Sequence, residues 1–179
     1  SAESLDNAIV AHAGLGGSTN AVIHLVAIAR RAGIPLTIDR FDEIARRVPV
    51  IADIRPSGRL LMEDFFYAGG MRAFLSRLSN HLALSCLTVS GRTLGEEIAG
   101  AKVWKDDVIR RLEDPVSPVG GIAILRGNIA PDGAVMKPSA AEPRLLAHRG
   151  PALAFESYDE MAAAVDRDDL DVTPDHVLV

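Results

Sequence analysis

Residues 14–24 read GLGGSTNAVIH, three glycines and three small polar residues that lead into an apolar run. Glycine lets the backbone turn sharply and approach a ligand closely, whereas Ser18, Thr19 and Asn20 are residue types that cap a helix start. The stretch therefore predicts a loop followed by a helix over residues 20–32. Free N–H groups and the positive end of the helix dipole would favour a bound carboxylate or phosphate there.

Neither common nucleotide-binding motif fits the spacing of this loop. A phosphate-binding loop needs Lys before the Ser or Thr that follows its last glycine, but Ser18 follows Gly17 directly. A dinucleotide fingerprint counted from Gly14 needs a glycine where Thr19 stands. Two interpretations stay open, namely anion binding and tight packing of the glycines before a core helix.

The pattern of residues 20–32 is apolar nearly all round, so we expect a largely buried helix. His24 lies within it and is expected to be a core histidine with satisfied hydrogen bonds rather than a ligand. Asp39 is predicted to cap the next helix. Lys137, which precedes a proline, fits a surface charge and a site role equally well.

Short strands and tight turns dominate after about residue 80, which makes this point the candidate domain boundary. Strands are predicted at residues 122–125 and 134–136. Thr93 with Glu96, and Ser157 with Glu160, have the spacing of helix capping boxes.

Composition restricts the setting of the chain. At 179 residues, with 48% hydrophobic and 24% charged residues, it is long enough for a sizeable core. The net charge is −5, and residues 81–179 carry 16 acidic against 10 basic groups, so we expect no nucleic-acid partner. The apolar stretch over residues 21–29 is too short to span a membrane, and no signal peptide is evident, so a cytoplasmic location is expected.

Cys86 is the only cysteine. A disulfide within the chain is therefore excluded, as is an iron–sulfur site built from cysteines of this chain alone.

Several blocks together carry a resemblance to a known family. The segment GGSTNAVIHLVAIAR is followed by Arg55-Pro56-Ser57-Gly58, by Met62-Glu63-Asp64-Phe65 with Ala68-Gly69-Gly70, by Leu87 to Leu94, and by LRGNIAPDGAVMKPSAA from Leu125 to Ala141. In this order the blocks resemble the IlvD/Edd dehydratase family, which includes dihydroxy-acid, phosphogluconate and sugar-acid dehydratases. The resemblance covers nearly the whole chain.

The resemblance implies an α/β fold and a piece of a longer protein. Residues 1–80 would be the C-terminal part of an α/β first domain. Residues 81–179 would be the N-terminal part of a β-barrel-like, mixed α+β second domain. The full-length protein would be a homo-oligomer.

The family's chemistry removes water from a 2,3-dihydroxy carboxylic acid to give a 2-keto-3-deoxy acid. The resemblance implies an iron–sulfur cluster and Mg²⁺ in the full-length protein, but the motifs that carry their ligands and the catalytic base are absent here. We therefore expect no cofactor on this chain, no catalytic residue within it and no activity from it alone. Ser18, Thr19 and Asn20 are the candidates for lining the substrate site, with helix capping as their alternative role.

The stretches MKPSAA and LLAHRG resemble the sugar-acid branch more than the branched-chain amino-acid branch. The expected substrate is thus an aldonate, with dihydroxy-acid dehydration as one alternative. A binding or structural module that lost its chemistry is another.

Overall fold

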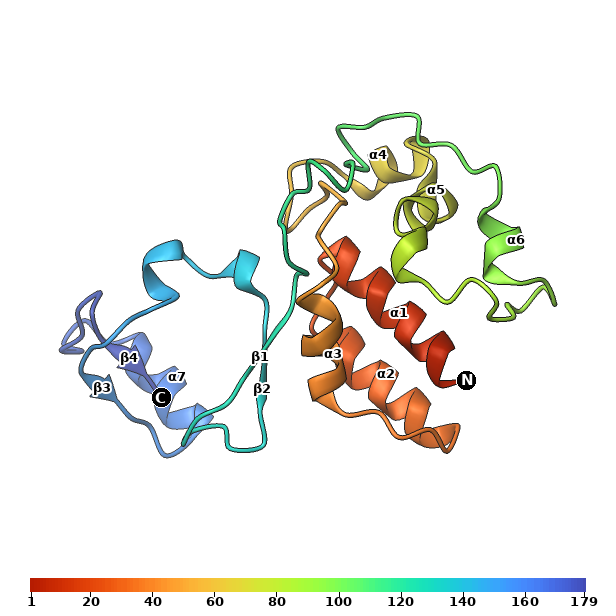
Figure 1. Ribbon diagram of the computed structural model, residues 1–179. Helices are drawn as coiled ribbons and strands as arrows, with labels where there is room; N and C mark the ends of the chain where they lie inside the picture. Colours follow the sequence, from red (N-terminus) through yellow and green to blue (C-terminus); the bar gives the residue numbers. More distant parts are fainter. The chain divides into compact units, whose positions relative to one another are not determined.

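The computed structural model describes all 179 residues and shows a mixed α/β fold (Figure 1). The chain divides into two compact units, Ser1–Ala140 and Ala141–Val179. The first unit contains α1 (Ala2–Leu15), α2 (Asn20–Arg31), α3 (Ile38–Ala45), α4 (Met62–Tyr67), α5 (Gly70–Arg77), α6 (Leu94–Ile98), β1 (Ala123–Leu125) and β2 (Ala134–Met136). The second contains β3 (Ala152–Leu153), α7 (Tyr158–Val165) and β4 (Val177–Leu178).

The core of the first unit forms where α1 packs against α3. Ile9, Val10 and Ala13 on α1 recur at helical spacing, and all three are buried. Phe41 and Ile44 on α3 are fully buried. Removing each large apolar side chain from water contributes about 1.5–3 kcal/mol, so this helix pair is a main source of stability.

The segment over residues 50–54 passes through the core without forming a regular strand. Its backbone makes isolated bridges, Val50 with Ser117 and Ala52 with Ile109. The N–H of Ile51 donates to the carbonyl of Gly14 over 2.9 Å. The segment is thereby fixed against the C-terminal end of α1, where the glycine loop begins.

Two small sheets complete the fold. Strands β1 and β2 pair antiparallel with Ala123 opposite Met136, and the N–H of Ile124 donates to Asp42 on α3 over 3.3 Å. In the second unit β3 and β4 pair parallel, with Ala152 opposite Val177. The four strands close no barrel, and the expected division at residue 80 stays a prediction.

Several local predictions are confirmed. Strands occupy residues 123–125 and 134–136. Thr93 Oγ1 accepts from the N–H of Glu96, whose carboxylate accepts from Thr93 in return. Ser157 caps α7 in the expected position.

Other local predictions are wrong. Helix α2 is mostly exposed, since only Val22 and Ala29 are buried on it, Ile23 is 68% exposed, and His24 lies at the surface. Within this chain α2 packs mainly on α1 and α3, and much of its remaining surface meets solvent. Thr37, not Asp39, occupies the position before α3.

Two adjacent phenylalanines on α4 test the core. Phe65 is buried and its ring centroid lies 5.7 Å from that of Phe74, whereas Phe66 is 72% exposed. We expect Phe65→Ala to lower the free energy of unfolding by about 3–5 kcal/mol because it leaves a cavity. Phe66→Ala should change it by no more than about 0.5 kcal/mol. Denaturant unfolding of the two variants measures the difference, and equal losses would contradict this packing.

Candidate functional site

A cavity of about 670 Å³ lies where α1 ends and α2 begins. This volume falls within the range of small-molecule sites. Its wall comes from three parts of the first unit: the glycine loop, the segment after residue 53 and the residues after β2. The lining residues are Leu15, Gly16, Gly17, Ser18, Thr19, Ile54, Arg55, Pro56, Met62, Lys137 and Ala140.

The glycine loop owes its path to two glycines with different roles. Gly16 ends α1 in the left-handed conformation, with φ of 62°, which side chains with a Cβ rarely adopt. Gly17 donates its N–H to the carbonyl of His12 over 2.9 Å. A Cβ on Gly17 would overlap the imidazole of His12, so this close approach requires glycine.

His12 holds the loop from inside. Its side chain is buried on α1, and Nε2 lies 2.8 Å from the carbonyl oxygen of Ser18. A carbonyl only accepts, so Nε2 carries the proton and donates. Burial lowers the pKa of His12, the bond to Ser18 opposes this, and the charge of Lys137 adds to the lowering. His12 is therefore neutral near pH 7.

The three predicted site residues do not share one position. Ser18 and Thr19 line the cavity, but Asn20 does not. Ser18 Oγ accepts from the N–H of Asn20 over 3.3 Å, while the hydroxyl of Thr19 makes no capping bond. The backbone N–H groups of Ser18 and Thr19 have no acceptor. Two donors and two hydroxyls thus remain near the cavity.

Lys137 reaches the cavity from the end of β2. Its ammonium donates to the carbonyl of Gly16 over 2.6 Å and lies 3.4 Å from that of Gly17. The side chain is half-buried, and burial lowers its pKa. The structure thus favours a site role over a surface charge, a choice that the sequence left open.

Sequence reasoning missed His12 and did not single out Arg55. His12 sits in an ordinary helical pattern, and its contact with Ser18 arises only because the chain reverses at Gly16 and Gly17.

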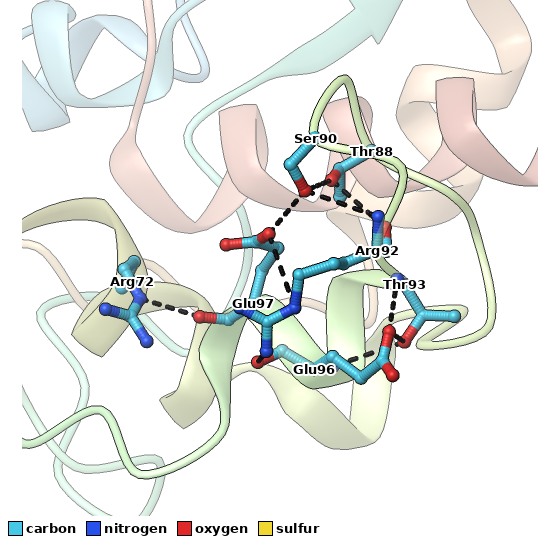
Figure 2. Close-up of polar contacts among 7 residues, drawn as sticks. All are labelled: Arg72, Thr88, Ser90, Arg92, Thr93, Glu96 and Glu97. Atoms are coloured by element: carbon cyan, nitrogen blue, oxygen red, sulfur yellow. Dashed lines mark hydrogen bonds and ion pairs between the residues drawn. The ribbon is translucent and has the colours of Figure 1, made fainter.

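A second polar cluster surrounds the loop before α6 (Figure 2). Figure 2 shows its members, which are Arg72, Thr88, Ser90, Arg92, Thr93, Glu96 and Glu97. Arg72 donates to the carbonyl of Glu97 over 2.6 Å and so ties α5 to α6. Hydrogen bonds from Thr93 lower the pKa of Glu96. Because the carboxylates and hydroxyls of this cluster bind one another, it is a structural network.

No three His, Cys, Asp or Glu side chains come together in a way that would hold a metal ion. Cys86 is a single, partly exposed thiol. These residues do not fit an iron–sulfur cluster or a carboxylate-bound Mg²⁺. No helix combines the length and apolar character that crossing a membrane requires.

Family profiles match along almost the entire chain. Residues 1–97 match the dihydroxy-acid/6-phosphogluconate dehydratase N-terminal profile, and residues 107–179 match the C-terminal profile of the same family. The chain belongs to the dihydroxy-acid/6-phosphogluconate dehydratase family. Members of this dehydratase family are hydro-lyases.

The relatives within the dehydratase family are named for different acids. The chain is 48% identical to an L-arabinonate dehydratase of Rhizobium leguminosarum, over 99% of this chain and 31% of the relative. It is 47% identical to a 6-deoxy-6-sulfo-D-gluconate dehydratase of Pseudomonas putida, over 97% of this chain and 30% of the relative. It is 49% identical to a dihydroxy-acid dehydratase of Caldanaerobacter subterraneus, over 91% of this chain and 30% of the relative. The chain spans about a third of the length of these curated relatives.

Gly17→Ala tests the close approach of the loop to His12. The added methyl group forces the imidazole to move and breaks its bond to Ser18, so we expect a loss of about 1–3 kcal/mol of unfolding free energy. Gly127→Ala is the matched control, because no atom lies within 4 Å of its added Cβ. Denaturant unfolding measures the free energy of unfolding of both variants. Equal losses in the two would contradict the close packing of Gly17 against His12.

The buried His12 should also make stability depend on pH. Its pKa is lowered in the folded state, so the unfolded chain binds the proton first and stability falls as pH drops below the ordinary value of about 6.5. We expect wild type to lose more unfolding free energy between pH 7.5 and 5.5 than His12→Gln does. The exposed His24→Gln should behave like wild type, and a His12→Gln variant with the wild-type pH dependence would contradict this assignment.

Proposed function

We propose that the full-length protein is a hydro-lyase that dehydrates a sugar acid, an aldonate, to a 2-keto-3-deoxy acid. One observation carries the proposal: relatives named for sugar acids align with 97–99% of this chain at 47–49% identity. Dihydroxy-acid dehydratases align with 91% of it. The difference favours the sugar acid as substrate.

Dihydroxy-acid dehydration is the second candidate. It is supported by the 49% identity to a dihydroxy-acid dehydratase, which equals that of an L-arabonate dehydratase of Azospirillum brasilense. Both reactions remove the proton at C2 and the hydroxyl at C3 of a 2,3-dihydroxy carboxylic acid. They differ in the rest of the carbon chain, which is polar in an aldonate and branched and apolar in the alternative.

In this proposal the glycine loop forms part of the substrate site. Ser18 and Thr19 line a cavity of suitable size and offer hydroxyls beside two unpaired backbone N–H groups. Such groups suit the oxygens of a polyhydroxy acid. Asn20 stays a predicted site residue without a contact to support it.

Several expectations concern the full-length protein and remain part of the proposal. The iron–sulfur cluster, Mg²⁺ and the base would belong to residues outside this chain, since the residues present do not fit them. Residues 81–179 would contribute to a β-barrel-like second domain. The enzyme would be a cytoplasmic homo-oligomer.

The substrate is tested by assaying the full-length protein with D-gluconate, L-arabinonate and 2,3-dihydroxyisovalerate and measuring the 2-keto product. We expect the aldonates to give the higher kcat/KM. Higher kcat/KM for 2,3-dihydroxyisovalerate would establish the second candidate, and no turnover of any acid would contradict a dehydratase.

Substitutions in the loop test its place in the site. Ser18→Ala and Thr19→Ala should each lower kcat/KM about tenfold, because a hydrogen bond to a charged ligand contributes about 1.5–3 kcal/mol. Ser85→Ala is the control, since Ser85 is exposed and lies outside the cavity. Loop variants that lose stability but keep kcat/KM would show that Ser18 and Thr19 serve only the helix start.

A further inference from the structure

The charge of the cavity beside the glycine loop is one-sided. Two cationic side chains, Lys137 and Arg55, line it, and no Asp or Glu does. The chain as a whole carries a net charge of −5, so the charge of the cavity lining is opposite in sign to that of the whole chain. A concave, purely cationic wall favours an anionic ligand.

Neither cation is neutralised by the protein. The ammonium of Lys137 binds only backbone carbonyls, those of Gly16 and Gly17. The guanidinium of Arg55 donates through Nε to the carbonyl of Arg59 over 3.3 Å, and its terminal nitrogens have no partner. By contrast the neighbouring Arg59 pairs with Asp53 over 2.6 Å.

The contacts with the two carbonyls also orient the ammonium group of Lys137. An ammonium has three donors, and a short bond to Gly16 uses one of them while the longer contact to Gly17 occupies a second. The third donor is left for the cavity that the side chain lines. A half-buried ammonium without a counter-ion gains most from a ligand that brings a negative charge.

We propose that this cavity binds the carboxylate of a polyhydroxy acid, with Lys137 as the main cationic contact and Arg55 as a weaker one at the exposed rim. This inference rests on the proposed function for its choice of ligand and deepens it by naming the side chains that select the anion. A carboxylate has about four acceptor sites, so Lys137 can take one oxygen while another group holds the second.

The test measures binding separately from dehydration. Calorimetry on the full-length protein, with divalent cations removed by a chelator so that gluconate is not turned over, compares D-gluconate with D-glucitol, a neutral polyol of the same carbon length. We expect Lys137→Met to weaken gluconate binding about tenfold and Arg55→Met about threefold, while glucitol binding stays the same. Lys137→Arg keeps the charge and should retain most of the affinity.

Two controls separate charge from support of the loop. Lys105→Met removes the same charge from an exposed position outside the cavity and should leave gluconate affinity unchanged. Added salt should weaken gluconate binding by wild type more than by Lys137→Met, because screening acts on the charge that the variant lacks.

Each outcome decides the inference. Equal weakening for gluconate and glucitol would mean that Lys137 only supports the loop, and it would overturn the proposal. So would unchanged gluconate affinity in Lys137→Met, or no gluconate binding by wild type. If the protein dehydrates gluconate but Lys137→Met leaves the gluconate affinity unchanged, the proposed function holds and this inference fails. If Lys137→Met weakens gluconate binding but the protein dehydrates no acid, this inference holds and the proposed function fails.

Discussion

The backbone reversal at Gly16 is the constraint on which the site depends. Its left-handed conformation ends α1 and turns the chain back toward His12. A Cβ on Gly121 would lie 2.5 Å from the Cα of Gly16, so two backbones meet here without room for a side chain. The carbonyl of Gly16 accepts from Lys137 and, over 3.4 Å, from Ser57. One turn thus gathers three distant segments of the chain at the end of α1.

This arrangement explains why a helix junction acquires a polar cavity. The carbonyls of the loop are taken up by His12 and Lys137, so they do not repel an anion from the wall. Two N–H groups, two hydroxyls and the cations remain for a ligand. The α1–α3 core supports this geometry because α1 fixes both His12 and the start of the loop, and Phe41 packs edge-on against the imidazole at 6.5 Å.

The apolar surface outside the site has a different character. Ile23 and Ile28 on α2, and Met62 and Phe66 on α4, are more than half exposed. The chain spans about a third of the length of its curated relatives. In this chain these apolar side chains meet solvent.

The sequence alone determined the local elements, because their causes are local. Capping residues predicted the starts of α6 and α7, short apolar runs beside glycine and proline turns predicted β1 and β2, and the order of motifs indicated the dehydratase family. It also marked Ser18 and Thr19 through the glycines beside them. The burial of α2 and the role of His24 were mispredicted, since both depend on what covers a helix. Only the tertiary structure decided that Lys137, about 120 residues away, reaches the carbonyl of Gly16, because such a contact depends on packing between distant segments.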